Sequence, residues 1–329
     1  MAFPASSTAC VAWSRVGDAL AVGSLRNAFL WTRTGARVLK NTNRAPLYAL
    51  AFSPQGEMLA CGSESKTTKL VSRGGKAVAS LSGDSGVVTH VSFDPRGERV
   101  LAGRALWTTG GEAIKRKTFS MISTFVDDET ILSAGPVYEE DLVHPTLCWM
   151  TPEGEVTRKV PLAAPVRHIV TDGEHVAVSY AARISVFDAR GLRLGDFERH
   201  KSGQTVSGLA LSGARVASGG FGDTDIWVTD FAGAPAMRLP GYARPLQHNG
   251  IAFAPHAPRI VAALGGPLAP SGGGDCVWLH DVESGRRVRL YVAENVWLAV
   301  DDGGRYMGTA ALCDDAKRED TSLLDALFA

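Results

Sequence analysis

The stretch ALAFSPQGEMLACGS at residues 49–63 sets a pattern that recurs along the whole chain. A similar stretch, VAWSRVGDALAVGS, occupies residues 11–24, and VSFDPRGERVLAG occupies residues 91–103. In each copy, apolar residues alternate on both sides of a short polar turn, which is the pattern of a β-hairpin. Pro, Gly and Asp supply the turn. The sequence therefore predicts a hairpin that is repeated at a spacing of about 40 residues.

Eight copies of this hairpin can be aligned on the apolar residue before the turn. A third apolar strand and a turn that ends in glycine follow, as in FLWTRTG and DIWVTDFAG, and a fourth strand comes next. Four short antiparallel strands per unit are typical of a propeller blade, which buries its faces by stacking in a ring. The aligned residues are Trp13, Phe52, Phe93, Phe125, Val170, Leu211, Phe253 and Val300, and the turn glycines are Gly35, Gly75, Gly111, Gly154, Gly191, Gly233 and Gly285.

These segments resemble the repeats of the WD40 family, most clearly in AFSPQGEMLACGS, SFDPRGERVLAG, DIWVTD and CVWLHD. The resemblance covers nearly the whole chain and implies an all-β fold, a β-propeller of four-stranded antiparallel blades. The Gly-His dipeptide of that family is missing before every first strand, and the Asp after Trp is rarely in place. The sequence therefore does not predict the family's side-chain hydrogen-bond network for most blades.

The number of blades stays open between seven and eight. Seven units are complete. An eighth, partial unit begins with NVWLAVDDGGRYMGTA at residues 295–310 and lacks a clear third strand. The mean spacing favours eight blades, whereas the family favours seven, with the C-terminal segment used in closure or docked outside. We expect a single domain over residues 1–329, with units near 9–45, 46–86, 87–119, 120–163, 164–204, 205–246 and 247–293 and a partial or closing unit at 294–329.

The composition limits the classes of function. The 34 Lys and Arg residues balance 34 Asp and Glu residues, so bulk charge does not predict binding to nucleic acid or to an anionic membrane. The sequence has no apolar run long enough to span a membrane and no pattern of a secretory signal. Its 5 cysteines are scattered singly, which indicates buried thiols in a reducing compartment. We therefore expect a cytoplasmic protein, and a composition rich in Ala, Gly and Arg favours a bacterial source.

No motif in the sequence predicts catalysis or metal binding. GDSG at residues 83–86 matches the core of a serine-protease nucleophile motif, but it falls between two units, where such residues form loops. The histidines have no metal-binding spacing, and the residues near the start of each first strand are too varied for a metal-centred ring. These residues are Tyr48, His90, Ser123, His168, Gly208 and Asn249. We therefore expect no enzyme activity, no catalytic residue and no cofactor.

Binding of another protein is the function that the resemblance implies. In WD40 propellers, the loops that lead into each first strand gather around one mouth of the central channel. Two long connections, at residues 135–146 and 265–275, are expected to open on the same face. Basic and aromatic side chains are common anchors of protein interfaces. We expect the protein-binding residues to be Arg44, Tyr48, Tyr138, Arg167, His200, Arg244, His248 and Trp297.

Three interpretations of function remain. The leading one is a non-catalytic scaffold or adaptor in a multi-protein complex, with no nucleic-acid or membrane partner. The first alternative is a small-molecule or catalytic site in the central channel, built from polar groups of several blades. The second alternative is a partner subunit of a bacterial effector or protease system, which the C-terminal sequence supports by resemblance alone.

Overall fold

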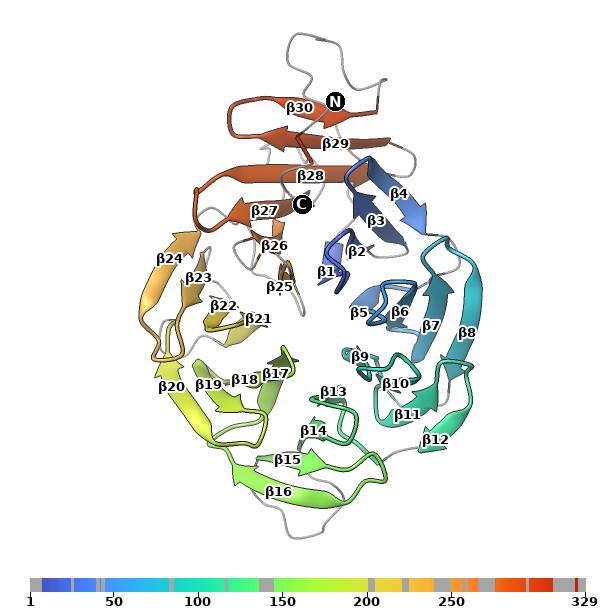
Figure 1. Cartoon of the computed structure of the whole chain (residues 1–329), viewed down its shortest axis with the longest axis vertical. Helices are drawn as coiled ribbons and strands as arrows, with labels where there is room; N and C mark the ends of the chain where they lie inside the picture. Colours follow the sequence, from blue (N-terminus) through green and yellow to red (C-terminus); the bar gives the residue numbers. More distant parts are fainter. Residues whose placement is uncertain are drawn as a thin grey trace.

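Six four-stranded sheets and one six-stranded sheet are arranged in a ring in the computed structural model of the chain (Figure 1). The strands of each sheet follow chain order and pair antiparallel, and the first strand of each sheet lies nearest the centre of the ring. The predicted all-β propeller is therefore confirmed. The structure describes residues 8–24, 27–39, 42, 45–82, 86–115, 118–135, 145–200, 205–220, 225–239, 250–255, 257, 260–265, 276–293, 296–309 and 323–324.

The strands are numbered in chain order, and each blade takes four of them. Blades 1 to 3 contain β1 (Thr8–Trp13), β2 (Leu20–Ser24), β3 (Ala28–Thr32), β4 (Gly35–Leu39), β5 (Leu47–Phe52), β6 (Met58–Ser63), β7 (Thr67–Ser72), β8 (Ala77–Ser82), β9 (Val91–Phe93), β10 (Arg99–Ala102), β11 (Ala105–Thr108) and β12 (Ala113–Lys115). Blades 4 and 5 contain β13 (Ile122–Phe125), β14 (Ile131–Ala134), β15 (Thr146–Met150), β16 (Val156–Pro161), β17 (Val166–Thr171), β18 (His175–Tyr180), β19 (Arg183–Asp188) and β20 (Arg193–Glu198). Blades 6 and 7 contain β21 (Val206–Ser212), β22 (Arg215–Gly220), β23 (Ile226–Thr229), β24 (Pro235–Leu239), β25 (Ile251–Phe253), β26 (Ile260–Gly265), β27 (Cys276–Asp281) and β28 (Arg287–Ala293).

The last two strands do not begin an eighth blade, so the eight-blade alternative is wrong. Strand β29 (Val296–Asp301) pairs with β28, and β30 (Tyr306–Gly308) pairs with β29, which lengthens the sheet of blade 7 to six strands. Only residues 294 and 295 separate β28 from β29, whereas the shortest link between blades is residues 162–165. A two-residue connection favours a hairpin, because it is too short to carry the chain back to the centre of the ring.

The tight turns follow the sequence pattern closely. In blade 2, the amide of Gly56 donates to the carbonyl of Ser53 at 2.9 Å, and Gly56 adopts a φ of +75°, which glycine tolerates without strain. The hydroxyl of Ser53 accepts a hydrogen bond from the amide of Met58 at 3.1 Å and closes the turn. The predicted glycines after the third strands also have positive φ, namely Gly35, Gly75, Gly111, Gly154, Gly191, Gly233 and Gly285.

The apolar core lies between neighbouring blades. Leu70 of blade 2 and Trp107 of blade 3 belong to one buried cluster, and Trp149 of blade 4 and Phe187 of blade 5 belong to another. The aromatic side chains of Trp149 and Phe187 meet edge to face, with centroids 5.8 Å apart. Each blade is therefore stabilised mainly by the blades beside it.

No helix in the described part of the chain is long and apolar enough to cross a membrane.

The seam between blade 7 and blade 1 joins the two ends of the chain. No strand is shared across it among the described residues, and a large apolar cluster fills it instead. Trp297 of β29 lies edge to face against the fully buried Trp31 of blade 1, with ring centroids 5.6 Å apart. Leu323 and Leu324 are buried in the same cluster. The hairpin of β29 and β30 and this C-terminal pair therefore help to hold the ring closed.

Gly35 provides a test of the closed seam, because a side chain there would collide with the ring of Trp297. Gly35→Ala should lower the free energy of unfolding by about 1–3 kcal/mol more than Gly135→Ala in urea titrations. Gly135 is a matched control, since its φ of +113° is close to the +118° of Gly35 and its nearest atom is the Ser120 hydroxyl, 3.6 Å from an added Cβ. Trp297→Ala should remove the difference between the two glycine variants. If Gly35→Ala and Gly135→Ala lost equal free energy of unfolding with Trp297 present, Trp297 would not pack on Gly35.

The stability of blade 7 should depend on pH through His280 of β27. This side chain is buried beside Trp278, with ring centroids 5.9 Å apart. Burial, and then the charge of Arg287, lower the pKa of His280 to about 3 from 6.5. The unfolded chain takes up a proton on His280 at a higher pH than the folded chain does. The contribution of His280 to the free energy of unfolding is therefore complete above pH 6.5 and falls as the pH drops toward 3.

Urea titrations at a series of pH values would measure this effect. The wild-type protein should lose about 2 kcal/mol of this contribution between pH 7 and pH 5. His280→Gln should lose less over the same interval, because the glutamine does not titrate. The same slope for the wild type and His280→Gln would contradict the assignment.

Candidate functional site

The two faces of the ring carry different connections. The face that we call the loop face carries the links between blades and the links between the second and third strands. The opposite face, the turn face, carries the short turns that follow first and third strands. Loops on a rigid scaffold are the usual place for binding residues, so the candidate site was expected on the loop face.

A hollow of about 360 Å³ opens on the loop face beside the starts of inner strands β13 and β17. Most of its exposed lining is apolar, but it also includes hydroxyl groups, one histidine and one arginine. We call it the loop-face hollow, and it draws on blades 3 to 6. Its lining residues are Thr89, His90, Ile122, Ala164, Pro165, Val166, Arg167, Ala181 and Thr205.

Arg167 is the charged residue of this hollow. It lies near the start of β17, next to buried Val166, and its side chain is exposed. It makes no hydrogen bond or ion pair with any residue that the structure describes. A guanidinium over apolar walls can hold a carboxylate through two parallel hydrogen bonds. The structure thus places this predicted residue where an acidic group could reach it.

His90 is a site residue that the sequence interpretation did not propose as protein-binding. It precedes β9 in blade 3, lines the loop-face hollow and lies 3.2 Å from the hydroxyl of Thr89 through its Nδ1 atom. Its ring lies 6.4 Å, between centroids, from that of His168 in blade 5, although blade 4 separates the two blades in ring order. Both histidines are among the varied residues that align at the starts of first strands in the sequence. That alignment could have identified them as residues at the channel mouth.

His200 was predicted as a protein-binding residue, and the structure corrects this. The side chain is buried, with 4% of its surface exposed, and its Nε2 atom lies 3.0 Å from the hydroxyl of Ser218 in β22. The residue before it, Arg199, stacks on Trp227 of β23, 4.1 Å from the ring centroid. Together these contacts tie the link between blades 5 and 6 to the body of blade 6. His200 is therefore a structural residue rather than a surface anchor.

Trp297 also lies away from the loop-face hollow. Its ring packs at the seam against Trp31 and against the β3–β4 turn at Gly35, which belongs to the turn face. Its backbone amide is held by the hydroxyl of Thr309 at 3.0 Å. Trp297 thus helps to close the ring, and its role in binding a protein stays a prediction. Tyr48 is half-buried at the start of β5, on the loop face, but it does not line the hollow.

The remaining candidates lie outside the described residues. These are Arg44, Tyr138, Arg244 and His248, together with Ser85 and most of the two long connections. Among the cysteines, Cys10, Cys61 and Cys148 are buried, as predicted for these three, and form no disulfide bond among the described residues. Burial raises the thiol pKa of Cys10 and Cys61. No group of three or more His, Cys, Asp or Glu side chains in the described part of the chain could hold a metal ion.

Comparison with known proteins agrees with this architecture. Residues 36–72 match the family model described as WD domain, G-beta repeat. The matched segment includes the outer strand β4 of blade 1 and strands β5 to β7 of blade 2. This chain is a seven-bladed β-propeller that carries a WD40 repeat. Its sequence matches that of no curated protein.

Solved structures resemble this propeller in fold. One is the β-propeller domain of Cps50 (Swd1) from Myceliophteria thermophila, with 15% identity and a TM-score of 0.63; the match covers 85% of this chain and 99% of that domain. Another is a chain in the crystal structure of the Mitotic Checkpoint Complex, with 14% identity and a TM-score of 0.64; the match covers 80% of this chain and 90% of the other. At such low identity, these similarities establish the fold alone.

The buried pair of His200 and Ser218 can be tested by a single substitution. Ser218→Ala should lower the free energy of unfolding by roughly 1–3 kcal/mol, because it leaves a buried ring nitrogen without this hydrogen bond. Ser179→Ala in blade 5 is the control, since the Ser179 hydroxyl is buried and has no hydrogen-bond partner among the described residues. Ser179→Ala should lower the free energy of unfolding by less than about 0.5 kcal/mol. Equal costs in urea titrations would contradict a specific role for the pair.

Proposed function

We propose that this WD40 propeller is a non-catalytic scaffold that binds a protein partner on its loop face, in the cytoplasm and within a multi-protein complex. Nucleic acid and membranes are not partners in this proposal. The observation that carries it is the exposed Arg167, which stands over the apolar walls of the loop-face hollow without an ion pair in the described part of the chain.

The chemistry of the hollow narrows the kind of partner surface. Ile122, Pro165 and Val166 offer apolar contact, while Thr89 and Thr205 place hydroxyl-bearing side chains in the lining. An interface anchor that joins apolar contact to one charged hydrogen bond matches this arrangement. We infer that the partner presents an Asp or Glu next to an apolar side chain, with the carboxylate directed at Arg167.

The fold neighbours support the proposal in general terms. One of them is a propeller domain, and the other is a chain in the crystal structure of a protein complex. A rigid ring with loops on one face suits recognition, because the frame fixes the positions of side chains from several blades. The matched family gives the same expectation, and the partner itself is left to experiment.

Charge reversal at Arg167 tests the proposal directly. The tagged protein would be used to capture partners from cells that express it, with recovery measured by quantitative mass spectrometry. Arg167→Glu should reduce recovery of a stoichiometric partner by about tenfold or more, since it replaces an attraction with a repulsion. Arg190→Glu is the matched control, because Arg190 is exposed in the β19–β20 turn of the same blade, on the turn face.

The outcome separates the two faces. A partner lost with Arg167→Glu and kept with Arg190→Glu supports binding at the loop-face hollow, and an acidic residue of that partner changed to arginine should restore capture by the variant. A partner that binds Arg167→Glu as well as the wild type would overturn the assignment of this hollow. Recovery of no partner from such cells would overturn the scaffold function itself.

A further inference from the structure

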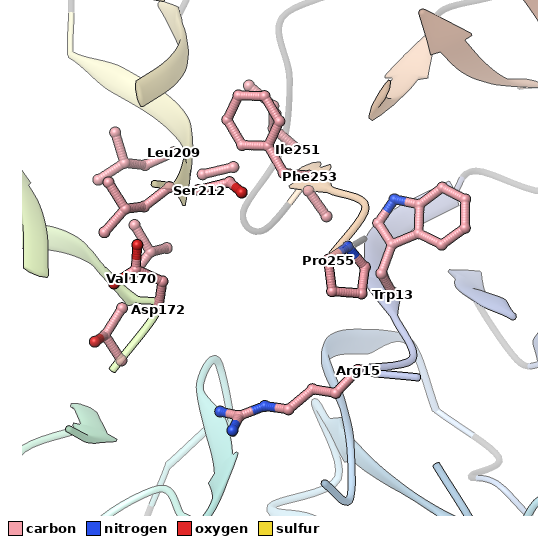
Figure 2. Close-up of a pocket in the computed structure, with 13 residues that line it drawn as sticks. Trp13, Arg15, Val170, Asp172, Leu209, Ser212, Ile251, Phe253 and Pro255 are labelled. Atoms are coloured by element: carbon pink, nitrogen blue, oxygen red, sulfur yellow. The ribbon is translucent and has the colours of Figure 1, made fainter. Parts of the chain in front are cut away.

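A second hollow lies at the opposite mouth of the central channel, on the turn face (Figure 2). It measures about 420 Å³, and we call it the turn-face cavity. Its walls come from the ends of β1, β17, β21 and β25, the innermost strands of blades 1, 5, 6 and 7. Sites for small molecules are usually concave and have volumes of about 300–1,000 Å³. The cavity is therefore large enough for a small organic ligand.

Small and apolar residues shape the interior of this cavity. Ala210 and Ala252 line it with single methyl groups, so little side-chain volume fills the space in front of β21 and β25. Val170, Phe253 and Pro255 contribute apolar walls on two sides (Figure 2). An apolar group of a ligand could lose its water here against fixed surfaces.

Arg15 supplies the cation of the turn-face cavity. It lies in the turn between β1 and β2, and Figure 2 shows its side chain extending from blade 1 across the mouth. The guanidinium makes no hydrogen bond or ion pair with any residue in the described part of the chain. The side chain keeps contact with solvent, but nearby protein removes part of its hydration and thereby lowers the pKa of Arg15.

The neighbouring carboxylates are engaged elsewhere. Asp18, in the same turn as Arg15, pairs with Arg73 at 2.6 Å. Asp172 lines the cavity and accepts backbone hydrogen bonds from the amides of Glu174 at 3.0 Å, His175 at 2.8 Å and Gly213 at 3.1 Å. These bonds fix the negative charge of Asp172 on the wall of the cavity. That charge repels anions, and it repels a dianion more strongly than a monoanion.

We propose that the turn-face cavity binds a small organic monocarboxylate, whose carboxylate pairs with Arg15 and whose apolar body rests on the walls formed by Val170, Ala252 and Phe253. Arginine and carboxylate match in geometry, because two parallel N–H donors meet two oxygens. The charge of Asp172 selects against phosphate monoesters, which are dianions at pH 8. This site is separate from the loop-face hollow, and the inference does not rest on the scaffold function.

Ligand-observed saturation-transfer NMR on the full chain tests the proposal, with phenylacetate as the probe. Phenylacetate should bind the wild-type protein at concentrations up to about 10 mM, and its uncharged counterpart phenylacetamide should bind about tenfold more weakly or worse. Arg15→Gln should weaken phenylacetate binding by a similar factor, because it removes the charged pair. Arg190→Gln should leave binding unchanged, because Arg190 is exposed on the turn face but does not line the cavity.

A third probe tests the role of Asp172. Phenyl phosphate, a dianion at pH 8, should bind more weakly than phenylacetate, and Asp172→Asn should narrow that difference. Thermal melts followed by circular dichroism would show that each variant is folded. The proposal is overturned if phenylacetate does not bind the wild type, if it binds Arg15→Gln equally well, or if phenylacetamide binds as tightly. An effect of Arg190→Gln equal to that of Arg15→Gln would also overturn it.

Discussion

The apolar packing of blade 7 against blade 1 is the contact on which the rest of the ring depends. Every other pair of neighbouring blades is joined by a link of the chain, whereas an apolar cluster packs between blade 7 and blade 1. Trp31 and Trp297 meet there, and Leu323 and Leu324 are buried beside them. Because a propeller blade buries its faces only against neighbours, an open seam would expose two faces at once. Closure therefore fixes the geometry of both channel mouths.

The sequence predicted the blades well because each blade is a local structure. Alternating apolar residues and turns such as the one at Gly56 specify strands that pair with their neighbours in the chain. The blade count was harder to predict, since β29 has the same hairpin pattern as an inner strand. The short link at residues 294 and 295 decided its place, and it did so through chain length rather than residue type.

The candidate site was only partly predictable, for a physical reason. Arg167 was expected on the loop face and lies there, beside a hollow that depends on residues from several blades. His200 and Trp297 occupy similar sequence contexts near links, yet one is buried on Ser218 and the other at the seam. An aromatic or histidine side chain near a link has the same sequence signature whether it faces solvent or a neighbouring blade. Three-dimensional contacts between distant residues decide between these outcomes.

The hairpin of β29 and β30 has a consequence for how the molecule is made. Blade 1 leaves the ribosome before the other blades, whereas Trp297 and the buried pair Leu323 and Leu324 are synthesised after the four inner strands of blade 7. During translation, the side of blade 1 that will face blade 7 has no partner, and exposed apolar surface of this kind invites aggregation or capture by chaperones. Synthesis of Trp297, Leu323 and Leu324 thus sets the moment at which a row of blades becomes a ring.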